Sequence, residues 1–376
     1  MTEAETVNTA QKTVVVKVGT SSITTVDGTI DQHRVNALCD EVAALKAADH
    51  QVVVVTSGAI AAGLPALGLG GAARPKDAQT LQAVSAVGQG KLIGTYQSAL
   101  SRHGLLAGQV LLTPLDFFLR AQYLHARSTL TRLLELGAVP IVNENDAVAD
   151  DEIRWGDNDR IAALVAHLVD ADLLVLLTDI EGVLSADPKL NPQASLIEEI
   201  VEVDHDLEQL AGGSGSLHGS GGMASKLAAA KIASWSGVRT VIAHAHRPQV
   251  LADALAAKPG IGTTVHARPN RLGARRLWIA FAVGSSGRIT VDAGARKVLE
   301  ERRVSLLPAG VTGVDGDFEI GQAVEIIDEN QIVFAKGLVR QNAATLRDTM
   351  GTRSTDLNAG VSPEVIHADD LVVLPN

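Results

Sequence analysis

The sequence predicts an α/β protein with a mainly parallel sheet covered by helices, followed by a small β-rich domain. Three observations support this prediction. Short β-branched runs alternate with amphipathic helical patterns as far as about residue 267, and such alternation indicates right-handed βαβ units. After that point the pattern changes to short strands separated by turn residues. The length of 376 residues fits two domains better than one.

Six strands are expected in the first part, each a run of mostly apolar residues. They cover residues 14–18, 51–56, 106–112, 139–142, 172–178 and 239–243. Such uninterrupted runs are typical of strands that are covered on both faces. Ligands bound to sheets of this type lie beyond the carboxyl ends of the strands, so the turns after these runs are where a site is expected.

Helices are expected between these strands, at residues 31–48, 77–102, 123–136, 158–169, 223–235 and 248–257. The first of them shows the pattern well. Its apolar residues Val35, Leu38, Val42 and Leu45 recur at steps of three and four, which places them on one face. Asp31 stands where it can cap the first turn.

The chain is expected to divide into a first domain at residues 1–267, a linker at 268–283 and a second domain at 284–376. Residues 268–276 are polar and basic, which suggests the linker. The second domain is expected to form strands at residues 287–291, 323–327, 332–335 and 371–374.

Composition excludes several classes of protein. The net charge of −11 disfavours non-specific binding to nucleic acid or to an anionic membrane. One cysteine, Cys39, cannot form a disulfide within the chain, which fits a reducing cytosol. The polar, acidic N-terminus does not resemble a signal peptide, and no apolar run reaches the roughly 18 residues of a membrane span. A cytoplasmic protein is expected.

Lys17 interrupts the first predicted strand, directly before a glycine turn. A charge in a covered strand must be compensated or lie near the open end of the strand. Lys17 is therefore either an anion ligand or a lysine whose ammonium group reaches solvent from the strand terminus. The segment alone leaves both interpretations open.

A glycine-rich segment at residues 219–226 leads into a predicted helix and ends at Lys226. Glycines let the backbone approach a phosphate, and the N–H groups of a first helical turn favour anions. The alternative is an ordinary surface loop that caps the helix. The segment is not a standard P-loop, and the dinucleotide pattern of three spaced glycines is absent from the chain.

Four polar clusters stand at the ends of predicted elements: three follow a predicted strand and one opens a predicted helix. They are found at residues 56–60, 143–147, 156–160 and 177–182. Amides and carboxylates there can recognise an amino group or orient two lysines, although Asn and Asp also make turns and helix caps. The 11 histidines show no zinc-binding spacing. No metal ligand is assigned.

Six motifs in order together resemble the glutamate 5-kinases of the amino acid kinase family. They are Val16-Lys-Val-Gly-Thr-Ser21, Val54-Val-Thr-Ser-Gly-Ala-Ile-Ala-Ala-Gly63, Asn143-Glu-Asn-Asp-Ala-Val148, Gly156-Asp-Asn-Asp159, Leu177-Thr-Asp179 and Gly221-Gly-Met-Ala-Ser-Lys226. Residues 285–361 are similar to a PUA domain. The resemblance implies a three-layer α/β/α sandwich with a PUA-like domain at residues 284–376.

The resemblance also implies the activity, which is transfer of the ATP γ-phosphoryl group to the side-chain carboxylate of L-glutamate in the first step of proline biosynthesis. Mg²⁺ would bridge phosphate oxygens, mostly through water and ATP. By this resemblance the catalytic residues are Lys17, Lys226 and Asp159. Glutamate would be bound by Ser57, Asp146, Asn158 and Asp157. The nucleotide would be bound by Lys17, Thr178, Asp179, Ser220, Gly221, Gly222, Met223, Ala224, Ser225 and Lys226.

The family further implies inhibition by proline, assembly into dimers or tetramers and transfer of the product to a glutamyl phosphate reductase. The sequence suggests two rival functions. An RNA-binding role for the C-terminal domain is disfavoured because residues 280–376 hold 9 Lys and Arg but 14 Asp and Glu. A kinase for another small acid is disfavoured by Val18-Gly-Thr-Ser21. Ser220 stands where the family resemblance suggests Thr.

Overall fold

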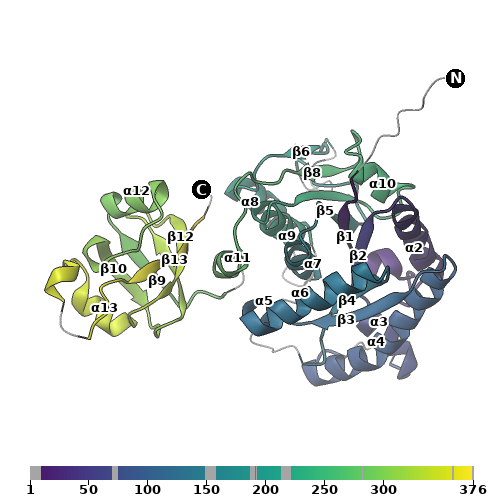
Figure 1. Cartoon of the computed structure of the whole chain (residues 1–376), viewed down its shortest axis with the longest axis horizontal. Helices are drawn as coiled ribbons and strands as arrows, with labels where there is room; N and C mark the ends of the chain where they lie inside the picture. Colours follow the sequence, from purple (N-terminus) through teal and green to yellow (C-terminus); the bar gives the residue numbers. More distant parts are fainter. Residues whose placement is uncertain are drawn as a thin grey trace. The chain divides into compact units, whose positions relative to one another are not determined.

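The structure of this protein is a computed structural model that describes residues 10–69, 75–148, 158–186, 191, 193–212, 222–281, 283–357 and 360–374. The chain forms two compact units, Met1–Arg271 and Leu272–Asn376, and both are drawn in Figure 1. Each unit has a sheet and a hydrophobic core of its own.

The described part of the N-terminal unit contains a sheet with the strand order β3-β4-β2-β1-β5-β7-β8-β6. Its strands are β1 (Thr13–Val18), β2 (Gln51–Thr56), β3 (Ala107–Leu112), β4 (Val139–Glu144), β5 (Leu173–Thr178), β6 (Glu199–Ile200), β7 (Arg239–His244) and β8 (Thr263–Val265). Every neighbouring pair is parallel except β7 with β8. The expected parallel sheet is confirmed. Strands β6 and β8 were not predicted, because two or three residues are too few to show a pattern.

Helices cover both faces of this sheet, as Figure 1 shows. One layer holds α2 (Gln32–Ala47), α4 (Ala78–Ser101) and α10 (Val250–Leu255), and the other holds α6 (Arg120–Glu135), α7 (Asn158–Leu168) and α9 (Met223–Trp235). Shorter helices are α1 (Thr20–Ile23), α3 (Ala59–Ala66), α5 (Pro114–Phe118) and α8 (His205–Gly212). The three-layer fold is confirmed. In the described part of the chain, no helix is both long and apolar enough to cross a bilayer.

Helix α2 forms as the sequence predicts. The Asp31 carboxylate accepts hydrogen bonds from the backbone N–H groups of His33 and Arg34, which satisfies two donors of the first turn. The predicted apolar face is buried in the core. The free thiol of Cys39 is buried on the same helix, and this burial raises its pKa to about 12.

The alternation of side chains along β1 decides where Lys17 points. Val14, Val16 and Val18 lie in the core cluster shared with α2 and α10. Successive side chains of a strand point to opposite faces. Lys17 is therefore directed to the face covered by α7 and α9, where the cationic group meets polar residues of those helices.

Helices α3 and α4 touch at backbone distance through two glycines. A Cβ atom built on Gly88 would lie 1.8 Å from the carbonyl oxygen of Ala59, and one built on Gly63 would lie 2.0 Å from that of Val84. Such distances exclude any side chain at either position without movement of the backbone. The contact fixes how α4 lies along α3, and hence which residues of α4 face the end of β4.

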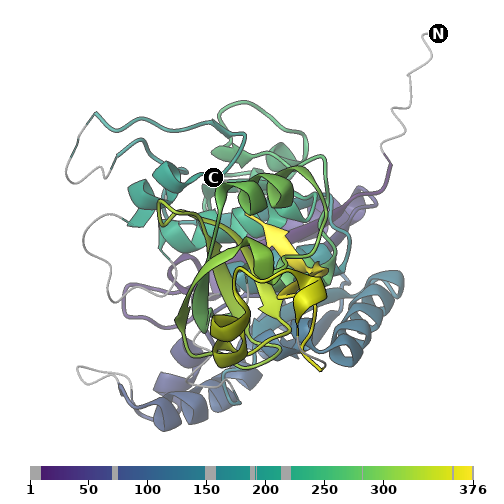
Figure 2. The same ribbon diagram turned by 90° about the vertical axis from the view of Figure 1, so that its left-hand side faces the viewer.

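The described part of the C-terminal unit has a five-stranded sheet in the order β10-β9-β11-β12-β13. Its elements are α11 (Ala274–Phe281), β9 (Gly287–Val291), α12 (Ala293–Glu301), β10 (Val311–Gly316), β11 (Ala323–Ile327), β12 (Val333–Val339), α13 (Ala343–Thr349) and β13 (Ile366–Val373). They can be followed from green to yellow in Figures 1 and 2. Phe318 and Phe334 are buried at its centre. The expected β-rich second domain is confirmed.

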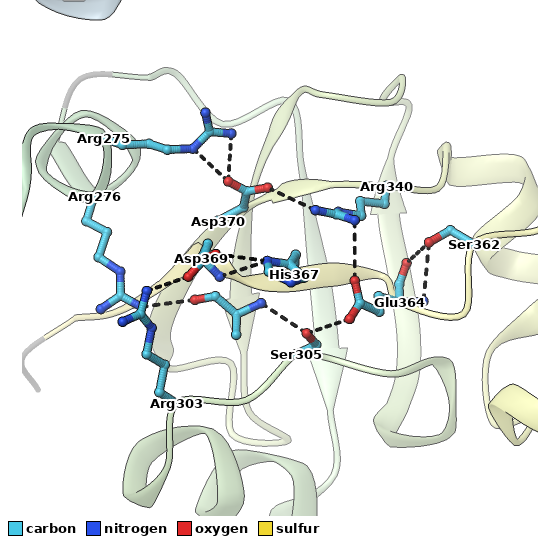
Figure 3. Close-up of polar contacts among 11 residues, drawn as sticks. Arg275, Arg276, Arg303, Ser305, Arg340, Ser362, Glu364, His367, Asp369 and Asp370 are labelled. Atoms are coloured by element: carbon cyan, nitrogen blue, oxygen red, sulfur yellow. Dashed lines mark hydrogen bonds and ion pairs between the residues drawn. The ribbon is translucent and has the colours of Figure 1, made fainter. Parts of the chain in front are cut away.

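The structure differs from the expectation that residues 268–283 form a linker, because α11 (Ala274–Phe281) occupies half of this segment. Leu277 and Ile279 are buried, and the helix packs on β12 and β13. Arg275 pairs with Asp370 of β13 at 2.7 Å, and Arg276 donates to the carbonyl oxygen of Ala368 at 3.0 Å, as Figure 3 shows. Arg275 and Arg276 of the basic run thus contribute to the fold of the second unit, while Arg268 and Arg271 pair with Glu202 and Asp170 of the first unit.

The close contact between α3 and α4 predicts opposite effects for two glycines of α4. Gly88→Ala should lower the free energy of unfolding by about 2 kcal/mol or more, because its methyl group overlaps the Ala59 carbonyl. Gly90→Ala is the matched control, since a Cβ there meets nothing within 4 Å, and it should be neutral or stabilising by up to about 1 kcal/mol. Urea unfolding followed by circular dichroism measures both. Equal stability of the two variants would contradict the contact.

Candidate active site

A cavity of about 910 Å³ opens at the carboxyl ends of the central parallel strands. Seven residues predicted from the sequence line it, namely Lys17, Ser57, Asp146, Asn158, Thr178, Asp179 and Lys226. They come from strand ends, loops and helix starts that are far apart in the sequence. The sheet brings them together because parallel strands end at one edge.

Two lysines share one carboxylate at the floor of this cavity. Lys17 of β1 lies with its Nζ 2.6 Å from Oδ1 of Asp159, and Lys226 of α9 lies with its Nζ 3.1 Å from Oδ2. The three side chains are 4%, 6% and 0% exposed, respectively. The interpretation that the ammonium group of Lys17 reaches solvent from the strand terminus is therefore wrong, because this group is buried against a carboxylate.

The electrostatics of this group follow from its burial and its charges. Burial by itself would raise the pKa of Asp159, but the nearby Lys17 and Lys226 outweigh burial, and the net effect lowers the pKa. The carboxyl group is thus ionised at neutral pH. Two ammonium groups thus lie at the floor of the cavity, where cationic groups favour a bound anion.

Helix starts hold two of these three residues. Asp159 belongs to the first turn of α7, and Lys226 belongs to the first turn of α9. Ser225 donates its hydroxyl to Asp159 at 2.8 Å, which adds a third contact to the carboxylate. The α9 start follows Gly222, whose backbone is extended, and its N–H groups are oriented as in anion sites at helix N-termini.

One side of the cavity, next to β2 and β4, is lined by hydrogen-bonding groups. Asn158 donates its Nδ2 to the Ser57 hydroxyl at 3.0 Å, and its Oδ1 accepts from the backbone N–H of Glu144 at 3.1 Å. One amide thus links the ends of β2 and β4. Asn143, at 1% exposure, also lines the cavity; its cluster was noticed in the sequence, but no role was assigned to it.

Asp146 is an acidic residue on the same side of the cavity. Burial raises its pKa, and a hydrogen bond from the Ser85 hydroxyl to Oδ2, 2.7 Å long, opposes that rise. Ser85 belongs to α4 and was not predicted as a site residue. No local pattern could have found it, because it lies 61 positions from its partner.

The other side of the cavity is formed at the end of β5. Thr178 is buried there and donates its hydroxyl to Asp179 at 3.1 Å. In the sheet, β1 lies between β2 and β5. Lys17 therefore stands between the polar residues at the ends of β2 and β4 and those at the end of β5.

Several of the predicted site residues are either not described by the structure or do not line the cavity. Asp157, Ser220 and Gly221 lie outside the described residues. Gly222, Met223, Ala224 and Ser225 are described, but of residues 222–226 it is Lys226 that lines the cavity. The roles assigned to all of them stay predictions.

The sequence reasoning missed part of the cavity wall. The residues without any sequence signal noted for them are a turn at residues 27–29 and residues 64, 65 and 69. Residues 19–21 and 58–61 also line the cavity, within motifs that were noticed in the sequence. Asp27-Gly28 is a turn dipeptide, and Gly28 has a φ of 78°, so this turn could have been recognised. Among the residues the structure describes, no group of three or more His, Cys, Asp or Glu is arranged to hold a metal ion.

Comparison with known proteins agrees with this geometry. The Amino acid kinase family profile matches residues 12–244, and the PUA domain profile matches residues 287–361. Glutamate 5-kinase of Salinispora arenicola is 47% identical over 375 residues, which cover 97% of this chain and 99% of that protein. Glutamate 5-kinase of Chromobacterium violaceum is 46% identical over 97% of this chain and 98% of that protein.

Among solved structures, carbamate kinase from Giardia lamblia bound to AMP-PNP aligns with a TM-score of 0.50 and 18% identity. The alignment covers 69% of this chain and 99% of that one. At this identity the likeness concerns the fold.

The buried ion group predicts a pH-dependent loss of stability in Asp159→Asn. Removing the carboxylate leaves two buried ammonium groups and should cost about 3 kcal/mol of unfolding free energy at pH 7. The pKa of Asp159 in the folded protein lies below its ordinary value of 3.8, so the stabilisation is present above that value and is lost as pH falls toward the folded pKa. The difference from the wild type should therefore shrink below about pH 3.8, as urea unfolding at pH 7 and pH 3.5 would measure.

Asp170→Asn is the matched control, because Asp170 also lies between two cations, Arg127 and Arg271, but is about half exposed. It should cost less than about 1 kcal/mol. Equal losses in the two variants would show that burial does not set the strength of the Asp159 group.

Proposed function

The chain belongs to the amino acid kinase family, among its glutamate 5-kinases, and from this premise we propose that it transfers the γ-phosphoryl group of ATP to the side-chain carboxylate of L-glutamate. The product is L-glutamyl 5-phosphate, formed in the first step of proline biosynthesis. The observation that carries the proposal is the pair of lysines on Asp159, between the two binding regions of one cavity.

The charges of the reaction explain this arrangement. Both substrates are anions, and negative charge spreads over the oxygens of the phosphoryl group as it moves. Lys17 and Lys226 supply two buried cations on opposite oxygens of one carboxylate. Such fixed charges stabilise the transition state without having to reorient. Asp159 accordingly holds the lysines in position and takes up no proton.

The nucleophile needs no general base. A glutamate side chain has a pKa of about 4.3 and is already ionised at neutral pH. The protein therefore has to hold the carboxylate in line with the phosphoryl group and bring two anions together. Ser57, Asn158 and Asp146 line the region next to β2 and β4 and are proposed to bind glutamate there, with Asp157 supporting its amino end.

The nucleotide is proposed to occupy the region at β5 and the start of α9. Thr178 and Asp179 line it, and Lys17 and Lys226 would contact the phosphates with residues 220–225. Mg²⁺ is proposed to be bound by phosphate oxygens and water. The two lysines on Asp159 support this, because that carboxylate is occupied by ammonium groups and is a poor candidate for a metal ligand.

Regulation and assembly are proposed from the family. Proline is proposed to compete with glutamate in its pocket, which a proline inhibition pattern independent of glutamate concentration would contradict. Assembly into dimers or tetramers is supported by edge strand β3, which has no charged side chain, and by the nearby exposed Leu115 and Leu119; sedimentation as a monomer would contradict it. Transfer of the labile acyl phosphate to a reductase and a cytoplasmic location complete the proposal.

An RNA-binding role for the PUA domain is not favoured. The arginines of its β13 face are paired with acidic residues, as in the contacts of Arg275 and Arg340 with Asp370 (Figure 3). Paired arginines offer little charge to a phosphate backbone. A gel shift with tight, salt-sensitive RNA binding would contradict this view.

The substrate is tested by ATP-dependent formation of acyl hydroxamate from glutamate, aspartate and acetylglutamate. Glutamate should give the highest kcat/KM, by at least about tenfold over aspartate, the scale of discrimination for one methylene group. A strong signal with another acid and none with glutamate would refute the proposal.

Lys17→Met tests the role of the central cation. The substitution retains the aliphatic chain and removes the charge, so kcat should fall by about 10²- to 10³-fold. Lys12→Met is the matched control, because Lys12 lies just before the same strand and forms an exposed ion pair with Asp172. It should retain wild-type kcat. A Lys17→Met enzyme with near-normal turnover would show that the charge is not used in catalysis.

A further inference from the structure

Two polar side chains of α4 are buried behind the glutamate side of the cavity. Ser85 is 3% exposed and Gln89 is 8% exposed. They are four residues apart and so share one face of the helix. Buried polar groups are costly unless they are hydrogen-bonded, and the partners of these two explain why they are there.

Both partners are residues that line the cavity. The Ser85 hydroxyl donates to Oδ2 of Asp146 at 2.7 Å, and Oε1 of Gln89 accepts from Nδ2 of Asn143 at 2.8 Å. Asn143 lies near the end of β4, and Asp146 lies three positions later, just after the strand. A single helix face therefore holds both side chains that this loop presents to the cavity.

The position of this face is fixed by the close contact between α3 and α4. Gly88, next to Gln89, touches the backbone of α3 at Ala59, and Val84, next to Ser85, is touched by Gly63. Helix α3 begins two residues after Ser57. Helix α4 thus ties the end of β4 to the turn that carries Ser57, and a shift of the helix would move both.

These contacts leave specific atoms for a ligand. Oδ1 of Asp146 has no hydrogen bond to any residue that the structure describes. Oδ1 of Asn143 is fully buried and has no partner among those residues. Because that oxygen is not exposed to the cavity, the acceptor that suits an ammonium group is Oδ1 of Asp146, which lines the cavity. Glutamate carries an ammonium group, while its simple dicarboxylate analogues do not.

Resting on the proposed function, we propose that Ser85 and Gln89 are positioning residues: Ser85 orients Asp146 toward the amino group of the substrate, and Gln89 holds Asn143 in the cavity wall beside it. They touch neither the phosphoryl group nor the lysines. Their loss should therefore weaken glutamate binding and the preference for an amino acid, with little change in the chemical step.

The test measures steady-state kinetics of Ser85→Ala. The KM for glutamate should rise about tenfold, the equivalent of one lost hydrogen bond to a charged group, with kcat and the KM for ATP within about twofold of the wild type. The ratio of kcat/KM for glutamate to that for glutarate, which lacks the amino group, should fall by a similar factor. Ser85→Thr keeps the hydroxyl and should restore the wild-type values.

Ser98→Ala, an exposed serine of the same helix, is the matched control and should behave as the wild type. If Ser85→Ala does not fold, Ser85→Cys and Gln89→Met, which retain volume, are measured in the same way. In Asp146→Asn, adding Ser85→Ala should change the KM little, because Ser85 acts through that carboxylate.

The outcomes separate the two proposals. An unchanged glutamate KM in Ser85→Ala, or equal rises in the KM for ATP and glutamate that Ser85→Thr does not reverse, would overturn the role of α4 while wild-type activity upholds the proposed function. A wild-type enzyme inactive with glutamate would overturn both.

Discussion

The site depends on one buried electrostatic group, the carboxylate of Asp159 between the ammonium groups of Lys17 and Lys226. Each ion would cost several kcal/mol to bury alone. The group is tolerable because each charge lies within hydrogen-bond distance of an opposite one. It joins the central strand β1 to the starts of α7 and α9, so the same contacts that allow burial also tie the sheet to one of its helical layers.

The asymmetry of this group gives the site its chemistry. Two cationic groups lie at the bottom of a cavity, at the strand in the middle of the sheet. Hydrogen-bonding residues lie on one side, next to β2 and β4, and Thr178 and Asp179 lie on the other, next to β5. A phosphoryl group passing between two anions would cross the position of Lys17. The fold thereby positions the polar residues and the two charged lysines, and the proposed reaction needs no general base to remove a proton.

Support for the proposed glutamate side of the cavity comes from helix α4, which contributes no residue to the lysine and aspartate group. Glycines at two backbone contacts set α4 against α3, and the polar face of α4 then meets the loop after β4. The packing of α4 on α3 therefore determines how Asp146 and Asn143 are oriented. The C-terminal unit has a separate core, and its arginines are largely engaged by its own acidic residues.

The sequence by itself determined the fold class, the main strands and helices, and the residues of the central ion group. Strands of five or more apolar residues and helices with a regular apolar face repeat a local pattern, and β-branched runs ending in glycine turns mark the edge where ligands bind. The motifs named Lys17, Asp159 and Lys226 separately. The tertiary structure decided which residues far apart in the sequence come into contact, because a local sequence pattern holds no information on such contacts. It brought Lys17 and Lys226, which are 209 positions apart, within 3.1 Å of the Asp159 carboxylate. It placed Lys17 between two groups of polar residues and formed helix α11 over residues 274–281. It also revealed Ser85 and Gln89, because their partners lie more than 50 positions away and only the packing of α4 on α3 brings them together.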